Sequence, residues 1–213
     1  MKAFIFDMDG VIIDSEPIHT AVMKQELADF PFTLTQEECD RYTGMTCTAV
    51  FADIIKKHHL PYTAQQMAAS HMNTFKQYVL QNHVEPMAGI VPLLEQLHRR
   101  QIPAAIASSS PLDAIEAVAD DFQIRHYYKF FVSGESLPHG KPYPDIYLKT
   151  AELLGIAPAD CVVLEDSCNG VRAAKDAGMY CIGFVNPNSG KQDLSRADEI
   201  VTDIASIDLD RYF

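Results

Sequence analysis

The sequence has little positive charge for its size. It contains 17 lysines and arginines against 29 aspartates and glutamates among 213 residues, which gives a net charge of −12. No basic run exceeds the pairs at 56–57 and 99–100. Because such a surface repels nucleic acid and anionic membranes, neither is expected as a partner. We expect a small-molecule partner and a monomeric chain.

Long apolar runs and closely spaced cysteines are also missing. No stretch approaches the roughly 20 apolar residues that cross a bilayer, and the opening MKAFIFDMDG has charge where a signal peptide would remain apolar. A cytoplasmic location is therefore expected. Neither a disulfide framework nor a zinc site is predicted, because the cysteines are odd in number and show no CxxC spacing. They are Cys39, Cys47, Cys161, Cys168 and Cys181.

What the sequence has instead is an alternation of short apolar runs with helical patterns from residue 87 onward. Strand-like runs such as IPAAIA, CVVLE and YCIGFV are separated by helix-period segments, which is typical of βαβ units. These runs lack strict polar alternation, as expected for a parallel sheet covered by helices on both faces. The first strand, AFIF, matches them. We therefore predict an α/β fold with a doubly wound parallel sheet.

Residues 15–86 have a different pattern. Apolar positions such as Val50 and Ile54 recur there with the period of a helix, and no strand is evident. The segment is predicted to be a helical cap domain inserted into an α/β core domain. The core domain then consists of residues 1–14 and 87–213, and the two crossings between the domains would act as hinges.

Polar side chains follow the predicted strands. In parallel α/β sheets ligands bind at the carboxyl ends of the strands, so residues at these ends are predicted to converge. They are Asp7 and Asp9 after the first strand, Ser108, Ser109 and Ser110 after the second, Lys141 after the third, and Glu165 with Asp166 at the fourth.

Carboxylates gathered in this way need a cation. Two unit charges about 4 Å apart interact by roughly 4 kcal/mol at an effective dielectric constant near 20, so the carboxylates would repel one another and a bound phosphate. Mg²⁺ fits, because it prefers hard oxygen ligands. Lys141 adds a compact positive charge, and Ser108 can hydrogen-bond a phosphoryl oxygen. Of Asp7 and Asp9, one carboxylate can attack phosphorus while the other moves protons.

Four segments resemble the signature motifs of the haloacid dehalogenase-like superfamily, in the branch of sugar phosphatases and phosphomutases that includes β-phosphoglucomutase. They are DMDGVIIDS at 7–15, ASSS at 107–110, GKPYPDIYL at 140–148 and LEDSCNGVRAAKDAG at 164–178. The helical insertion also falls where that branch carries its cap. The resemblance implies a Rossmann-like sheet domain, Mg²⁺ as cofactor, and reaction through an aspartyl-phosphate.

The resemblance also implies a role for each site residue. Asp7 is the nucleophile and Asp9 the general acid/base, which points to phosphate esters rather than carbon–halogen bonds. Ser108 and Lys141 hold the transferring phosphoryl group. The implied ligands of Mg²⁺ are Asp7, the backbone carbonyl of Asp9, Glu165 and Asp166.

The cap distinguishes a phosphatase from a phosphomutase. In the mutases of this branch an arginine in a cap loop binds the second phosphate, and the matching position in TGMTCTAV is Cys47. Because cysteine lacks the bidentate fork of arginine, hydrolysis of a small monoester such as a sugar phosphate is predicted over a β-phosphoglucomutase-type reaction. His19 matches a histidine of the mutases and mildly favours that alternative. Cys47 and His19 are both predicted to contact substrate.

Several smaller questions stay open. Ser109 and Ser110 either cap the helix that begins at Pro111 or contact substrate, and Asp14 is predicted to cap the first helix of the insertion. Asn169 is predicted to orient the metal-binding loop. A remote alternative is a non-catalytic phospho-aspartate switch, since response-regulator receivers combine acidic residues, a hydroxyl, a lysine and Mg²⁺ on a parallel sheet. Receivers are shorter, however, and carry the acceptor aspartate on a later strand.

Overall fold

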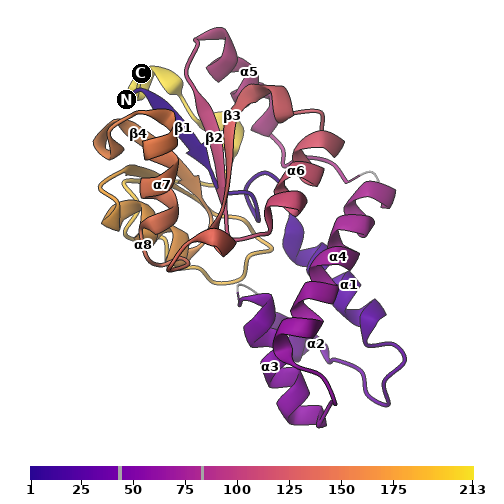
Figure 1. Cartoon of the computed structure of the whole chain (residues 1–213). Helices are drawn as coiled ribbons and strands as arrows, with labels where there is room; N and C mark the ends of the chain where they lie inside the picture. Colours follow the sequence, from indigo (N-terminus) through magenta and orange to yellow (C-terminus); the bar gives the residue numbers. More distant parts are fainter. Residues whose placement is uncertain (43–44, 83) are drawn as a thin grey trace.

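Six parallel strands form one sheet in the order β3-β2-β1-β4-β5-β6 (Figure 1). The computed structural model describes residues 1–42, 45–82 and 84–213. The α/β fold with a doubly wound parallel sheet is confirmed. The strands are β1 Ala3–Phe6, β2 Ala104–Ser108, β3 Tyr128–Ser133, β4 Cys161–Glu165, β5 Tyr180–Phe184 and β6 Glu199–Val201.

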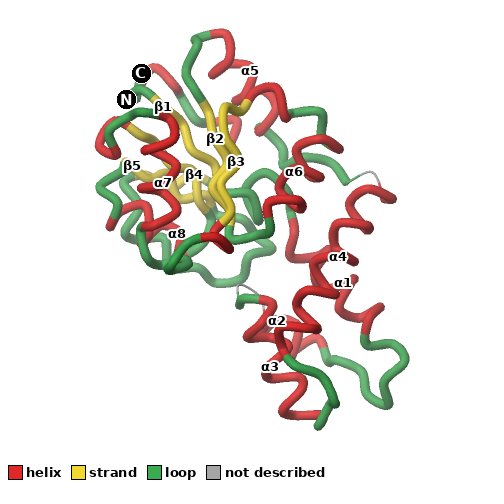
Figure 2. The backbone as a smooth tube through the Cα atoms, in the orientation of Figure 1, coloured by secondary structure: helices red, strands yellow, loops and turns green. Residues whose placement is uncertain are grey.

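Helices cover both faces of this sheet and also form the inserted segment (Figure 2). In the inserted segment they are α1 Ser15–Glu26, α2 Gln36–Tyr42, α3 Cys47–His58 and α4 Ala64–Asn82. The helices that flank the sheet are α5 Ile90–Arg99, α6 Leu112–Asp121, α7 Asp145–Leu154 and α8 Cys168–Asp176.

The central strand β1 explains why the sheet is covered on both sides. Phe4 and Phe6 are fully buried in an apolar cluster with α5 and α6, while Ile5 is fully buried on the other face with α7 and α8. A strand buried on both faces needs no polar alternation, which agrees with the apolar run AFIF. Its carboxyl end is the point where polar side chains begin.

The inserted helices have an apolar cluster of their own, which contains Phe51 and Ile54 of α3. Ile18 of α1 and Phe75 of α4 belong instead to the cluster of the sheet, so the base of the insertion packs directly on the core (Figure 1). The division into two domains at residues 14 and 86 stays a prediction. Among the described residues, no helix combines the length and the apolarity of a membrane span.

Candidate active site

The carboxyl ends of β1, β2 and β4 border a cavity of about 740 Å³, and α1, α3 and α4 line its opposite side. A cavity of this size suits a small metabolite. The predicted site residues that line it are Asp7, Asp9, His19, Cys47, Ser109, Ser110, Lys141 and Asp166.

Lys141 is fixed by three acceptors. Its Nζ donates to Oδ1 of Asp7 at 2.8 Å, to Oε1 of Glu165 at 2.6 Å and to the Ala107 carbonyl at 3.3 Å. These bonds use all the donors of an ammonium group. Burial by itself lowers the pKa of Lys141, but the charges of Asp7 and Glu165 outweigh it and raise this pKa. The lysine is therefore a fixed positive charge beside Asp7.

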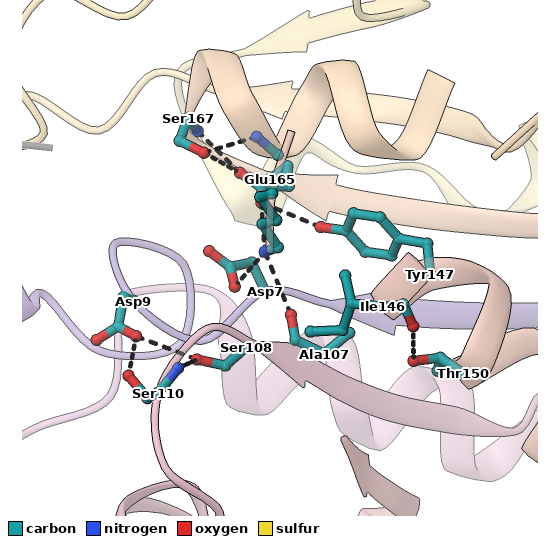
Figure 3. A network of polar contacts seen from close by, with 12 residues as sticks. Asp7, Asp9, Ala107, Ser108, Ser110, Ile146, Tyr147, Thr150, Glu165 and Ser167 are labelled. Carbon is teal, nitrogen blue, oxygen red and sulfur yellow. Dashed lines mark hydrogen bonds and ion pairs between the residues drawn. The ribbon is translucent and has the colours of Figure 1, made fainter. Parts of the chain in front are cut away.

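Glu165 holds this lysine and is itself held from several sides (Figure 3). Its Oε1 also accepts from the Tyr147 hydroxyl at 3.0 Å, and its Oε2 accepts from the backbone N–H and the hydroxyl of Ser167 at 2.9 and 3.0 Å. Gly170 makes room for the carboxylate, because a Cβ there would lie 1.5 Å from Oε1. A metal ion bound directly by Glu165 would have to replace one of these donors.

Asp166 follows Glu165 and lies on the cavity wall. It is 4% exposed, and its Oδ2 accepts a hydrogen bond from the hydroxyl of Ser189. Gly10 permits this arrangement, since it has a φ of +75° and a Cβ there would lie 1.9 Å from Oδ2 of Asp166. The close approach of the two strand ends thus requires a glycine after Asp9.

Asp9 has one oxygen held by serines and one without a protein donor. Its Oδ2 accepts from the hydroxyls of Ser110 at 2.7 Å and Ser108 at 3.2 Å (Figure 3). Its Oδ1 is buried and has no hydrogen-bond partner among the described residues, and Nε2 of His19 lies 4.0 Å away. Burial lowers the pKa of His19 to about 4, so this imidazole is neutral near pH 7.

Three buried carboxylates form a group that fits a metal ion. Asp7, Glu165 and Asp166 each offer an oxygen within 4.8 Å of the others. Burial raises the pKa of Asp7 to about 7; Lys141 lowers it, while Glu165 and Asp9 raise it. Burial, then the charges of Glu165 and Asp7, raise the pKa of Asp166 well above its ordinary value. Lys141 therefore does not neutralise the cluster, and a hard divalent cation fits its oxygen ligands.

One interpretation from the sequence is wrong, and one alternative that the sequence left open is excluded. Asp14 does not cap α1, because its carboxylate accepts from the side-chain amides of Asn186 at 3.4 Å and Asn188 at 2.6 Å. It connects the start of the insertion to the loop after β5. Ser110 does not cap α6, since its hydroxyl donates to Asp9. The hydroxyl of Ser108 is fully buried and also points to Asp9.

The other uncertain residues lie at the rim of the site. Ser109 is exposed and Asn169 lies three residues after Asp166, and both line the cavity. Ser109 makes no cap with its side chain, because α6 has no side-chain N-cap bond. Contact with substrate stays a prediction for Ser109, and orientation of the metal-binding loop stays one for Asn169.

Sequence reasoning missed three residues of the site. Ser189 follows β5, so extending the strand-end argument to a fifth strand would have found it. Tyr147 reaches Glu165 from α7, and no spacing pattern points to it. His71 of α4 lines the cavity and bonds to His19 of α1 at 2.9 Å. Only the packing of α1 against α4 brings these histidines together.

Known proteins resemble this chain in sequence and in fold. Residues 1–178 match the sequence model of a hydrolase family described as haloacid dehalogenase-like hydrolase. The β-phosphoglucomutase of Bacillus subtilis is 33% identical, with 86% of this chain and 83% of the relative covered. Hexitol phosphatase B of Escherichia coli is 31% identical, with 88% and 85% covered. The crystal structure of CbbY from Rhodobacter sphaeroides in complex with phosphate has a TM-score of 0.87 at 25% identity, over 97% of this chain and 96% of that one.

Proposed function

The chain belongs to the haloacid dehalogenase-like hydrolase family, and on that premise we propose that it is a Mg²⁺-dependent phosphatase of small sugar-type phosphate monoesters. The observation that carries the proposal is the pair of Asp7 and Lys141, 2.8 Å apart at the cavity, with Asp9 two residues further along the chain. A nucleophile, a fixed positive charge and an acid/base group thus share one side of a cavity for a small molecule.

Asp7 is the proposed nucleophile. Lys141 donates to its Oδ1, so Oδ2 forms the bond to phosphorus while the bond from phosphorus to the leaving alcohol breaks. Lys141 also offsets negative charge on the transferring group. The hydroxyl of Ser108 donates to Asp9 at 3.2 Å. We propose that it donates instead to a phosphoryl oxygen when substrate is bound.

Asp9 is the proposed general acid and base. Ser110 and Ser108 hold its Oδ2, and Oδ1 gives a proton to the leaving oxygen. In the second half of the reaction the same carboxylate takes a proton from water as the water attacks the aspartyl-phosphate. The products are free phosphate and the regenerated Asp7.

Asp7 and Asp166 are the principal proposed ligands of Mg²⁺, with Glu165 and the backbone carbonyl of Asp9 as the further predicted ones. When bound, the ion supplies positive charge beside the phosphate and favours the ionised form of these carboxyls. Glu165 has a second proposed task, which is to hold Lys141 in place.

The charge of the cavity wall supports a substrate with a single phosphate. Lys141 is the one lysine or arginine among the described residues that line the cavity. Acidic side chains also line the cavity and would repel a second anionic group on the substrate, although one of them, Asp113, is paired with Lys76. The acidic residues outside the catalytic group are Glu16, Asp113 and Glu135.

A phosphomutase is the second candidate, supported by the similarity to β-phosphoglucomutase and by His19 near Asp9. A mutase of that type binds a second phosphate, and Cys47 occupies the position expected for the arginine that does so. Burial, followed by the charges of Asp9 and Glu16, raises the pKa of the Cys47 thiol to about 12. A neutral thiol cannot balance a phosphate, so hydrolysis is preferred.

Phosphate release from a panel of sugar monophosphates and matching bisphosphates, with Mg²⁺, tests the proposal. We expect many turnovers per chain on a monophosphate, little reaction with its bisphosphate, and no turnover in Asp7→Asn. A single phosphorylation without turnover would identify a switch. With β-glucose 1-phosphate and a trace of the bisphosphate, formation of glucose 6-phosphate faster than free phosphate would identify a mutase.

A further inference from the structure

A second group of metal-binding side chains lies on the wall of the cavity that the inserted helices form. His19 of α1, Cys47 at the start of α3 and His71 of α4 each offer a ligand atom, and these atoms lie within 4.8 Å of one another. All three residues line the cavity. Because each comes from a different helix, no spacing in the sequence reveals the group.

Hydrogen bonds determine which ring nitrogens of the two histidines carry a proton and which have a free lone pair. Nδ1 of His71 bonds to Oε2 of Glu26 at 2.8 Å, and Nε2 of His71 bonds to Nδ1 of His19 at 2.9 Å. A carboxylate only accepts, so Nδ1 of His71 carries the proton and Nε2 of the neutral ring has a lone pair. The hydroxyl of Thr74 donates to the other oxygen of Glu26 at 2.9 Å. Such a carboxylate–histidine pair is the outer arrangement that orients histidine ligands of zinc.

Cys47 adds a sulfur ligand in a setting that suits a cation. It is the first residue of α3, where helix N–H groups favour a thiolate, but burial raises its pKa to about 12, so the metal itself must displace the thiol proton. The thioether of Met72 lies 3.9 Å from its Sγ. The carboxylates of Asp9 and Glu26 lie beside His19 and His71, and their negative charge favours a bound cation.

We propose that His19, Cys47 and His71 form an inhibitory Zn²⁺ site that is separate from the carboxylate site for Mg²⁺. Two imidazoles and a thiolate are ligands that zinc accepts and Mg²⁺ does not favour, and three protein ligands leave a fourth position open to the cavity. At Zn–N distances of about 2.0–2.1 Å, tetrahedral geometry needs nitrogens about 3.3 Å apart. Nδ1 of His19 and Nε2 of His71 are 2.9 Å apart, so on binding they separate by a few tenths of an ångström and the rings turn until both lone pairs face the metal.

Zinc binding changes the protonation of His19 and of Cys47. His19 changes tautomer: Nδ1 releases its proton to solvent so that its lone pair can bind the metal, and Nε2, which lies 4.0 Å from Asp9, takes up a proton from solvent. The thiol of Cys47 releases its proton to solvent. The ion would occupy part of the cavity proposed for the substrate. Inhibition of turnover rests on the proposed phosphatase function, whereas the binding of zinc does not.

Cobalt spectroscopy tests the binding directly. Co²⁺ is titrated into the whole chain with Mg²⁺ in saturating excess, so that the carboxylate site is filled. We expect intense d–d bands of tetrahedral Co²⁺ and a thiolate-to-cobalt charge-transfer band, both displaced by Zn²⁺. The charge-transfer band should disappear in Cys47→Ser and persist in Cys168→Ser, which removes an exposed thiol outside the group. No such band in the wild type, or its loss only in Cys168→Ser, would overturn the site.

Two further variants keep the proposal testable if Cys47→Ser does not fold. His71→Gln should abolish the tetrahedral spectrum, and Glu26→Gln should weaken Zn²⁺ affinity by about 10–100-fold, because it removes the outer partner of His71. Unchanged affinity in both variants would contradict the proposal.

Zinc inhibition is then measured against each variant's own zinc-free turnover, in saturating Mg²⁺. A cobalt spectrum without any phosphatase activity would refute only the proposed function. Full activity that zinc does not inhibit, with no cobalt spectrum, would refute only the zinc site.

Discussion

The Nζ atom of Lys141 lies 2.6 Å from Oε1 of Glu165 and also joins this carboxylate to Asp7, which is 2.8 Å from the same nitrogen. The side chains are between 0% and 9% exposed, so removal of the lysine leaves two carboxylates buried without their cation. Breaking a buried ion pair in this way costs about 3–5 kcal/mol. We expect Lys141→Met to lower the free energy of unfolding by about that amount in urea denaturation with a chelator present.

Lys149 provides the matched control. It lies on α7 and pairs with Glu152 at 3.0 Å, but its side chain is 40% exposed and that of Glu152 is 69% exposed. Because exposed pairs contribute little, Lys149→Met should leave the unfolding curve almost unchanged. Equal losses in the two variants would show that the buried triad has no special stability.

Two opposing effects decide whether the substitution of Gly170 by alanine stabilises or destabilises the protein. It lies inside α8, where alanine is favoured over glycine by about 1 kcal/mol. A Cβ at this position would lie 1.5 Å from Oε1 of Glu165, so the carboxylate must leave its bonds to Lys141 and Tyr147. We expect Gly170→Ala to destabilise the protein by about 1–3 kcal/mol despite the better helix propensity.

The comparison for Gly170→Ala is Gly140→Ala, since a Cβ at Gly140 would have no heavy atom within 4 Å. Thermal unfolding of both variants measures the effect. An unchanged or higher melting temperature for Gly170→Ala would mean that Glu165 moves aside at no cost.

The sequence predicted the sheet and most of the polar side chains that meet at its carboxyl edge for a geometric reason. Parallel strands end at the same edge, so Asp7, Lys141 and Asp166 had to meet once their strands were identified. Which hydrogen bond each side chain makes was not predictable, because it depends on packing across elements. Asp14 shows this, since a residue suited to capping α1 bonds instead to Asn188 after β5.

The histidines show the same limit in the insertion. His19 was selected for its match to a family position, whereas His71 lies in a helix pattern that suits any amphipathic segment. Their contact depends on the crossing of α1 and α4, and the rings are further fixed by the stacking of His19 on Phe75, with centroids 4.4 Å apart. The local sequence does not predict how these two helices cross.

The raised pKa of Asp7 predicts how stability depends on pH without metal. Burial raises this pKa to about 7, against 3.8 for the ordinary carboxyl, so the folded state binds a proton that the unfolded state releases between these values. Stability conferred by that proton is present below pH 4 and is lost as pH rises to about 7, by up to about 4 kcal/mol. Asp7→Asn should flatten this part of the curve of unfolding free energy against pH, measured with a chelator present. A wild-type curve that rises from pH 4 to 7 would contradict the assignment.

Mg²⁺ should stabilise the protein more at pH 8 than at pH 6. The ion binds the ionised carboxylates, and protonated Asp7 and Asp166 must first lose their protons. The increase in melting temperature on adding Mg²⁺ measures this difference. It should be much smaller in Asp166→Asn, whose amide keeps the size of the side chain but not its charge. An equal increase at both pH values would exclude these carboxyls as the ligands.

The substitution Asp9→Asn removes the proposed proton transfer but keeps the hydrogen bonds that hold this side chain. The amide oxygen of asparagine can still accept from Ser110 and Ser108, so the fold and the Mg²⁺-dependent shift in melting temperature should persist. Turnover of a sugar phosphate should fall by about 10²–10⁴-fold, because the alkoxide leaving group needs a proton.

The leaving group supplies the sharper test of Asp9. A nitrophenolate leaves without protonation, so the first half of the reaction with p-nitrophenyl phosphate should lose far less rate in Asp9→Asn than the same step with a sugar phosphate. Single-turnover measurements are required, since attack of water on the aspartyl-phosphate also uses Asp9. Equal losses for both substrates would mean that Asp9 does not protonate the leaving oxygen. Its bonds to Ser108 and Ser110 would then have a structural purpose alone.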